Sequence, residues 1–405
     1  MPAWRRCCRP TAPWIASRNP WASAESRGAG NRSARNGYVP QVRTLKNKKR
    51  PSPGNGSGAA TISDVARAAG VSTMTVSRVI NRAGSVRHET VAVVDAAIER
   101  LHYAPNPAAR SLAGARQMRI GLLYSHPSEA YLGGLLMGAL EQANRSHVQL
   151  LIERCAGEGE CLQAARRLVA EGIDGFILPP PLCDSRPLLT FLKQSQTPCV
   201  LIAAGVPSAS ASSVGIDDLA AAQTMTAHLL GLGHTRIGFI AGNPDNSASA
   251  RRQKGYEQAL LAQDLTLAPE LIEPGLCTYR SGLDAAEKLL NLAEPPSAIF
   301  ASNDDMAAAA VAVAHSQGLA VPGDLTVCGF DDTLMATTIW PELTTVRLPL
   351  GSMARTGLEM LVSAVKARRN GQASAICHES VGYTLVRRHS DAAPRRRPAA
   401  TRRQA

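Results

Sequence analysis

Several kinds of segment are missing from this 405-residue sequence. Its apolar runs all fall short of the ~18 residues that a membrane-spanning helix needs. The first residues include Arg5, Arg6 and Arg9 but no apolar signal core. Aromatic residues reach only 4% while hydrophobic residues reach 45%, so a core must be built mainly of Ala, Leu, Val and Ile. We therefore expect a cytoplasmic protein that does not span a membrane.

Metal-binding and nucleotide-binding motifs are missing as well. The nine Cys residues include no C-x-x-C pair and no Cys/His cluster at zinc spacing, which favours reduced thiols. No G-x-G-x-x-G follows the first expected strand of the large domain, and the sequence holds neither a P-loop nor a G-x-S-x-G elbow. We expect no enzyme, no metal site and no cofactor.

Positive charge is concentrated at the two ends of the chain. The formal net charge is +12, to which residues 1–60 contribute +11 and the residues from Arg387 onward +6. The composition predicts that residues 1–60 and 389–405 are disordered basic extensions. No Met occurs between Met1 and Met74, so an over-long gene start explains residues 1–60 as well as a true arm does. A transit peptide is a third explanation.

At Thr61 the basic N-terminal segment ends, and the sequence from there predicts short amphipathic helices. Thr61 followed by Asp64 is typical of a helix start, and Ser72 predicts the start of a second helix after a Gly turn. Residues 87–103 predict a third helix. Two short helices joined by a tight turn form a helix-turn-helix, although an ordinary helical hairpin has the same pattern. The exposed face of the second helix, residues 72–81, would carry Ser72, Thr73, Met74, Thr75, Ser77, Arg78 and Asn81.

From Met118 onward, short apolar runs alternate with longer helical stretches. The runs with strand character are 119–124, 148–153, 175–180, 199–205, 213–217, 236–242, 298–302, 325–332 and 343–349. Between them lie helical stretches such as 132–146, 218–232, 249–263, 280–292, 304–318 and 351–369. Repeated βα units predict parallel sheets with helices on both faces. So many units favour two doubly wound lobes, in which ligands bind at the carboxyl ends of the strands.

Motifs along the whole of this region resemble those of the LacI (lactose-repressor) family. They are "TISDVARAAGVSTMTVSRVIN", "YAPNPAARSLAG", "GHTRIGFIAG", "ASARRQKGYEQAL", "AIFASNDDMA", "GDLTVCGFDD" and "PELTTVRLP". The resemblance implies an all-α helix-turn-helix headpiece at 61–104 and a hinge helix and linker at 105–117. It implies an α/β periplasmic-binding-protein-like core of two doubly wound lobes at 118–388.

The function implied by the resemblance is sequence-specific transcriptional regulation, in most cases repression. The implied partners are a near-palindromic double-stranded DNA operator and a small-molecule effector, either a sugar or a sugar derivative. Because no leucine heptad for a tetramerising coiled coil follows Arg388, we expect a homodimer.

The resemblance also assigns roles to residues that would contact DNA. Thr73, Met74 and Arg78 match positions that read base edges. Asn106 to Ala113 matches a hinge helix that enters the minor groove, and Leu112 matches the leucine that wedges into a base step. On its own, Leu112 is also compatible with a core position. The positions that match phosphate contacts are Ser72, Thr75, Ser77, Asn81 and Tyr103.

In the core, the resemblance places Arg252 at the position of a ligand-clamping arginine. Asn303 and Asp331 match effector-contacting positions at strand ends, and helix capping is the alternative role for both. The residues expected to line the rest of the effector site are Ser125, Tyr131 and, on the other lobe, Tyr279. Asp217 and Asp304 are interpreted as helix caps. The residues at 179 and 203, Pro and Ala, depart from the galactoside-binding pattern.

Three other functions fit parts of the sequence. A free sugar-binding protein would share the core but would lack the headpiece. An enzyme would share the Rossmann-like pattern, and a nonspecific nucleoid protein would share the basic ends. Specific DNA binding separates a regulator from all three.

Overall fold

The computed structural model describes residues 60–80, 86–103, 117–125 and 127–395. The chain divides into two units, one ending at Tyr103 and the other beginning at Ala104. Asn81, Asn106, Leu112 and Ala113, which were assigned to DNA binding, lie outside the described residues.

The first unit, here called the headpiece, is built of three short helices: α1 (Ile62–Ala69), α2 (Thr73–Ile80) and α3 (His88–Arg100). Thr61 and Asp64 form the expected capping box at the start of α1, and Gly70 ends that helix in the left-handed conformation. The core of the headpiece is formed by Val65, Ala66, Val76, Val79, Val94 and Ala97. The predicted pair of short helices joined by a Gly turn is therefore present.

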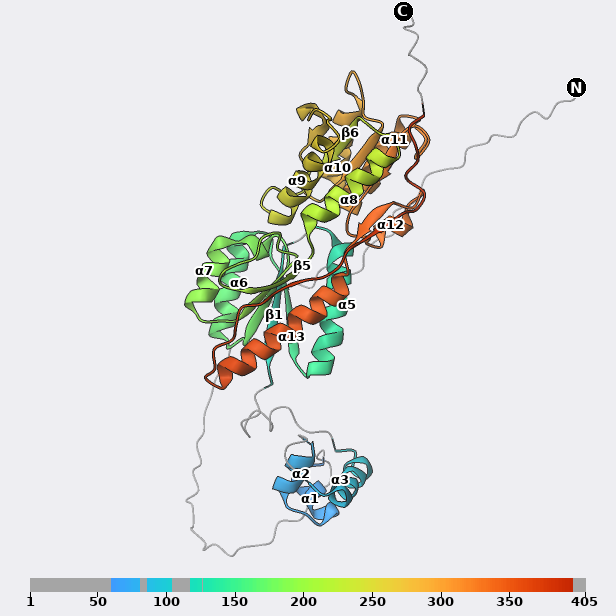
Figure 1. The fold of residues 1–405 in the computed structure, drawn as a ribbon. Helices are drawn as coiled ribbons and strands as arrows, with labels where there is room; N and C mark the ends of the chain where they lie inside the picture. Colours follow the sequence, from blue (N-terminus) through green and yellow to red (C-terminus); the bar gives the residue numbers. More distant parts are fainter. Residues whose placement is uncertain (1–59, 81–85, 104–116, 126, 396–405) are drawn as a thin grey trace, which may run out of the picture. The chain divides into compact units, whose positions relative to one another are not determined.

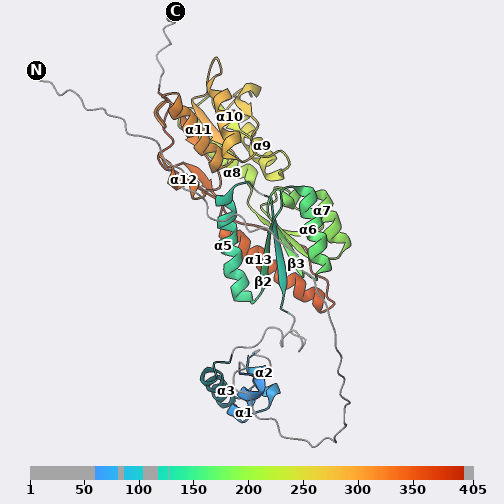
Figure 2. The same ribbon diagram turned by 180° about the vertical axis from the view of Figure 1, so that it is seen from behind.

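The N-terminal lobe of the second unit contains a six-stranded parallel sheet in the order β11-β5-β4-β3-β1-β2. Its strands are β1 (Arg119–Tyr124), β2 (Gln149–Arg154), β3 (Gly175–Leu178), β4 (Cys199–Ile202), β5 (Ser212–Gly215) and β11 (His378–Ser380). Its helices are α5 (Glu129–Ser146), α6 (Glu158–Ala170), the short η1 (Leu182–Asp184), α7 (Arg186–Gln194) and α13 (Leu350–Arg369). Helices α5 and α13 pack together on one face, while α6 and α7 cover the other (Figure 1 and Figure 2).

The C-terminal lobe contains a four-stranded parallel sheet in the order β7-β6-β8-β9. Its strands are β6 (Ile237–Ile240), β7 (Ile272–Glu273), β8 (Ala298–Ala301) and β9 (Thr326–Cys328). Its helices are α8 (Asp218–Gly231), α9 (Ser247–Leu261), the short η2 (Pro269–Leu271), α10 (Tyr279–Leu290), α11 (Asp304–Ser316) and α12 (Met335–Thr338). An antiparallel pair, β10 (Thr345–Arg347) and β12 (Thr384–Val386), completes it. The core therefore has the two doubly wound lobes that the sequence pattern predicts.

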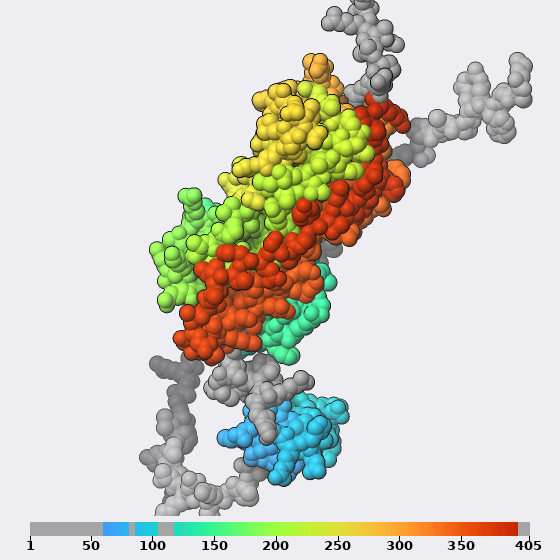
Figure 3. Space-filling model, viewed as in Figure 1, coloured from blue at the N-terminus to red at the C-terminus, as the bar shows by residue number. Residues whose placement is uncertain are grey.

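The chain passes from one lobe to the other between β5 and α8, between β10 and α13, and between β11 and β12. Figure 3 shows the C-terminal part of the chain, coloured orange to red, lying along both lobes. Three connections of the chain therefore join the two lobes.

The folded core extends beyond residue 388, where we expected the disordered tail to begin. Ser390 is fully buried, and its hydroxyl donates a hydrogen bond to the carbonyl oxygen of Val327 at 2.6 Å. The backbone N–H of Val327 donates to the carbonyl of Ser390 at 2.9 Å. These bonds continue the edge of the C-terminal sheet, so the expected boundary was too early.

Two cysteines depart from the expectation of reduced thiols. Cys155, which follows β2, and Cys161 on α6 form a disulfide. Cys183, Cys277 and Cys328 are buried free thiols in the core. No helix within the described ranges is long and apolar enough to cross a membrane.

Candidate DNA-reading helix and effector cleft

The predicted base-reading side chains lie on the exposed face of α2. Val76 and Val79 are buried in the headpiece core, which turns Thr73, Met74 and Arg78 outward. Met74 is 65% exposed, so its apolar side chain is free to contact a partner. Positions 74 and 78 are one helical turn apart and therefore share a face.

The predicted phosphate-contacting side chains flank this face. Ser72 is exposed, and its hydroxyl accepts a hydrogen bond from the backbone N–H of Thr75 at 3.1 Å, which caps α2. Thr75 and Ser77 are half-buried, and so is Tyr103, which packs against the headpiece core. Hydroxyl groups and backbone N–H groups at a helix start are suitable donors to phosphate oxygens.

Arg252 of α9 lies at the centre of a polar cluster at the carboxyl ends of the C-terminal-lobe strands. It is only 7% exposed. Its Nε donates to the Asp218 carboxylate at 2.8 Å and its Nη1 donates to the carbonyl of Ser302 at 2.6 Å. Its guanidinium also lies 3.7 Å from the centre of the Phe330 ring. The planar group is therefore held by a charge, a carbonyl and an aromatic face.

Asp331 approaches the same guanidinium at a longer distance, 3.4 Å between Nη1 and Oδ1. Its backbone has a positive φ of 103°, and its N–H donates to the carbonyl of Val346 at 2.8 Å. Asp331 caps no helix, because Leu334 stands at the N-cap of α12. The structure therefore excludes the capping role for Asp331 and places its side chain in the polar cluster around Arg252.

Asn303, in contrast, caps a helix. It is the N-cap of α11, where its Oδ1 accepts from the backbone N–H of Met306 at 3.0 Å. Its Nδ2 donates to the carbonyl of Cys277 at 3.1 Å. Tyr279 begins α10 just beyond Cys277, but its side chain is 41% exposed. An effector role for Tyr279 stays a prediction.

Asp304 is not the helix cap that we expected. Its carboxylate accepts from the N–H of Thr333 at 2.7 Å, and from the hydroxyls of Thr333 at 3.2 Å and Thr345 at 2.7 Å. Burial raises the pKa of Asp304 to about 7, although the Thr345 hydroxyl opposes that rise. Asp304 fixes the loop that holds Asp331. Asp217 does cap α8, accepting from the N–H of Ala220 at 3.1 Å.

The N-terminal lobe supplies the opposite wall. Tyr131 of α5 is buried, and burial together with the nearby charge of Asp331 raises the pKa of its phenol well above the ordinary value. Tyr131 of the N-terminal lobe therefore lies close enough to Asp331 of the C-terminal lobe for the two side chains to interact electrostatically. Ser125, in the loop after β1, lines a hollow of about 540 Å³ between the lobes, to which Asn243 and Asp245 of the C-terminal lobe also contribute.

Sequence reasoning missed two acidic residues that organise this site. One is Asp218, the fully buried partner of Arg252. The other is Asp184, whose carboxylate accepts from Ser247 across the two lobes. The only signal for Asp218 was its position beside the predicted cap Asp217.

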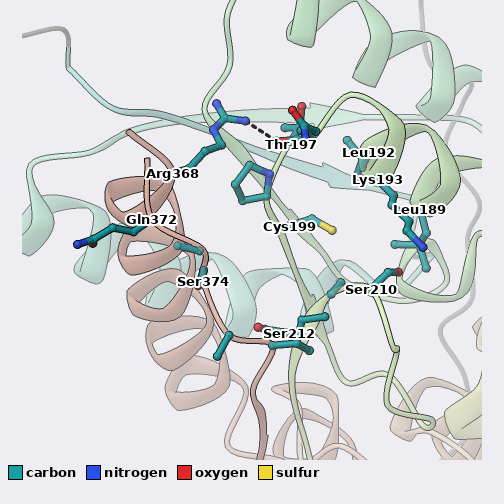
Figure 4. A pocket seen from close by; sticks show the side chains of 16 residues that line it. Leu189, Leu192, Lys193, Thr197, Cys199, Ser210, Ser212, Arg368, Gln372 and Ser374 are labelled. Atoms are coloured by element: carbon teal, nitrogen blue, oxygen red, sulfur yellow. Dashed lines mark hydrogen bonds between the residues drawn. The ribbon is translucent and has the colours of Figure 1, made fainter. Parts of the chain in front are cut away.

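A second hollow, of about 290 Å³, lies at the other end of the N-terminal-lobe strands (Figure 4). Cys199 and Ser212, which begin β4 and β5, form its floor, and Lys193 and Arg368 stand on opposite sides. Arg368 donates to the carbonyl of Gln196 at 2.6 Å. Ligands bind at the carboxyl ends of parallel strands in such folds, so this hollow is separate from the cleft.

Comparisons with known proteins agree on both parts of the chain. Residues 61–106 match the model of the family "Bacterial regulatory proteins, lacI family", and residues 226–390 match "Periplasmic binding protein-like domain". The HTH-type transcriptional regulator GalR of Escherichia coli (strain K12) is 32% identical over 336 residues, covering 83% of this chain and 96% of GalR. The HTH-type transcriptional regulator DegA of Bacillus subtilis (strain 168) is 34% identical over 335 residues, covering 82% and 97%.

Solved structures are similar over the same length. A lac repressor dimer bound to operator and the anti-inducer ONPF has a TM-score of 0.68 at 27% identity, covering 83% of this chain and 100% of that one. A complex of the transcriptional regulator CelR with cellobiose has a TM-score of 0.63 at 30% identity, covering 82% and 99%. The similarity therefore includes the headpiece and the core.

Proposed function

The chain belongs to the lacI family of bacterial transcriptional regulators, and on that premise we propose which of its residues read DNA and which bind the effector. The protein is a sequence-specific DNA-binding regulator, with a repressor role, whose operator affinity is controlled by a small molecule. It acts as a homodimer on an operator whose two-fold symmetry mirrors that of the dimer. We place it in the cytoplasm, where a bacterial chromosome lies, and assign it binding functions only.

We assign base reading to Thr73, Met74 and Arg78. The support is their common exposed face on α2, opposite the buried valines. A guanidinium binds the O6 and N7 atoms of guanine through two hydrogen bonds, and apolar atoms contact a thymine methyl group. Ser72, Thr75, Ser77, Asn81 and Tyr103 would fix the helix on the phosphates, and Asn106 to Ala113 would form the minor-groove hinge.

We assign effector binding to the cleft between the lobes. The observation that carries this assignment is the buried Arg252, held at the strand ends by Asp218 and the Ser302 carbonyl. Asp331 and Tyr131 approach it from the two lobes, and Ser125 lines the hollow between the lobes. Carboxylate, guanidinium and phenol groups together match the alternating donors and acceptors of a sugar or sugar derivative.

The proposed switch follows from the connections between the lobes. A ligand held by both walls changes how the lobes rotate about these connections, and so changes the spacing of the two hinges in a dimer. Its effect on operator affinity equals its differential affinity for the two lobe arrangements, typically about 1–3 kcal/mol of coupling.

Selection of binding sites from random DNA by the full-length chain tests this function. We expect a near-palindromic sequence that binds about 10³-fold or more tightly than scrambled DNA at the same salt concentration. A thermal-shift panel of mono- and disaccharides then identifies a ligand that changes the affinity for that site. Equal affinity for selected and scrambled DNA would instead identify a nonspecific nucleoid-type protein.

A further inference from the structure

Negative charge exceeds positive charge in the inner part of the effector cleft. Arg252 is the buried cation there, and it faces the buried carboxylates of Asp218 and Asp331. Asp305 lies beside them, and burial raises its pKa although a hydrogen bond from Ser128 of the opposite lobe opposes that rise. One guanidinium therefore faces two carboxylates, with a third nearby.

The hollow between the lobes that Ser125 lines also has an excess of negative charge. The hollow of about 540 Å³ is lined by Glu158, Asp184 and Asp245, against the single cation Arg186. At the outer rim, Arg251 is already paired with Asp217 at 2.8 Å. A cleft lined by one sign of charge concentrates ligands of the opposite sign and repels ligands of the same sign.

Asp331 is the least satisfied of these carboxylates. Its side chain is buried, and within the described residues its one polar contact is Arg252 at 3.4 Å. That distance is long for a charge-assisted hydrogen bond, because such bonds lie near 2.7–2.9 Å. Arg252 makes its two shorter bonds to Asp218 and to the Ser302 carbonyl. Burial raises the pKa of Asp331 well above its ordinary value, although Arg252 opposes that rise, so the charged form of Asp331 is unfavourable until a cationic donor binds beside it.

The neighbouring acidic residues, unlike Asp331, have short contacts with hydrogen-bond donors. Asp332 is held by Arg347 and by Arg388, each at 2.6 Å. Asp304 accepts hydrogen bonds from Thr333 and Thr345. The hydroxyl of Ser302, fully buried next to the carbonyl that binds Arg252, has no hydrogen-bond partner among the described residues. Asp331 and Ser302 thus leave an acceptor and a hydroxyl available beside Arg252.

We propose that the effector is a polyhydroxylated amine, such as an amino sugar, whose ammonium group binds Asp331 while its hydroxyl groups meet Ser302 and the Tyr131 side of the cleft. This inference rests on the proposed effector site. An ammonium group supplies the short, charge-assisted bond that Arg252 does not give Asp331. A sugar acid or sugar phosphate would instead add negative charge to a cleft that already has an excess.

The test compares three matched classes of probe on the full-length chain: 2-amino-2-deoxyhexoses, the parent hexoses and the corresponding hexuronic acids, each in the gluco, galacto and manno forms. Calorimetry at pH 7 and constant ionic strength measures binding, and operator affinity measures the response. We expect one amino sugar to bind about tenfold or more tightly than its parent hexose, and its uronic acid to bind more weakly than either.

Asp331→Asn should remove the preference for the amine: we expect it to weaken binding of the amino sugar about tenfold more than it weakens binding of the parent hexose. Asp217→Asn is the matched control, because Asp217 lies at the rim and Asn also caps helices well; it should keep the preference. If a hexose or a uronic acid acts through Arg252 and no amine does, the amine proposal is wrong and the effector site stands. If no probe of any class changes operator affinity, the proposed effector site fails with it.

Discussion

The Asp184 carboxylate in the N-terminal lobe accepts two hydrogen bonds from Ser247 in the C-terminal lobe, one from its backbone N–H at 2.9 Å and one from its hydroxyl at 2.7 Å. The Ser247 hydroxyl in turn accepts from the N–H of Gly205 at 2.9 Å. Ser247 is the first residue of α9, the helix that carries Arg252. The contact that joins the lobes and the residue that we propose to bind the effector therefore lie on one rigid element.

Removal of this contact should loosen the cleft. Asp184→Ala deletes the acceptor of both bonds, so we expect a loss of about 1–3 kcal/mol from the lobe contact. Hydrogen exchange at the Ser247 amide should become about tenfold or more faster, since that amide loses its partner. Asp245→Ala is the control, because Asp245 lines the same hollow as Asp184. Unchanged exchange at the start of α9 would show that the Asp184–Ser247 contact does not hold the lobes.

The crossing of α5 and α13 depends on a small residue. An added Cβ at Gly138 would overlap the carbonyl oxygen of Gly351 and lie 2.6 Å from its Cα. Gly138→Ala should therefore destabilise the core by about 1–3 kcal/mol. Gly133→Ala on the same helix has nothing within 4 Å and should be neutral or stabilising. Urea unfolding of both variants measures the difference, and equal stability would contradict the observed packing of these helices.

His234 gives the C-terminal segment a pH-dependent anchor. Its Nε2 lies 2.8 Å from the carbonyl of Ala392 and its Nδ1 lies 2.8 Å from the Ser297 hydroxyl. Burial lowers the pKa of His234, so the folded state binds fewer protons at this site than the unfolded state. Its contribution to stability is present above the unfolded pKa and decreases as the pH falls through about 6.5.

Substitution of His234 should reduce that pH dependence. We expect His234→Gln to lose less stability than the wild type when the pH falls from 7.5 to 5, whereas the exposed His315→Gln should behave like the wild type. Denaturant unfolding at the two pH values gives the comparison. A pH dependence of stability identical in all three proteins would show that His234 does not contribute to it.

In the headpiece, Arg78→Ala should weaken operator binding by about 1–3 kcal/mol and relax the base preference at one position in each half-site. Arg67→Ala removes an exposed arginine of α1 that pairs with Asp64, and should leave the base preference unchanged. Site selection with both variants measures the preference position by position. If selection with Arg78→Ala returns the wild-type sequence, Arg78 contacts phosphate or solvent instead of a base.

Local patterns were enough to predict most of the fold. The caps at Thr61 and Asp217 and the long helices of both lobes depend on residues close together in the sequence, and they appear where expected. The strands β7, β11 and β12 were missed because each has only two or three residues and, unlike the equally short β9 and β10, none of them is a buried apolar run. Their pairing partners come from elsewhere in the chain, which local pattern does not reveal.

The site was predictable only in part, for the same reason. The motifs pointed to Arg252 and Asp331, and the structure places these two side chains together. Asp218 meets Arg252 over a separation of 34 residues, and Asp184 meets Ser247 over 63. Contacts of this kind depend on how the lobes fold and face each other. Asn303 caps α11, as one of its two expected roles requires, and its contact with an effector stays a prediction.

The central claim is that effector binding at Arg252 controls operator affinity. The most direct measurement is fluorescence anisotropy of a labelled operator with Arg252→Ala, with and without the effector that the sugar panel identifies. Arg251→Ala is the control, since the adjacent side chain pairs with Asp217 at the rim. Arg252→Lys, which keeps the charge beside Asp218 but lacks the planar fork, guards against loss of the fold.

The account predicts that Arg252→Ala binds the free operator with nearly wild-type affinity and no longer responds to the effector, while Arg251→Ala responds normally. A wild-type midpoint and amplitude of the response in Arg252→Ala would contradict the assignment of the effector site to this cleft.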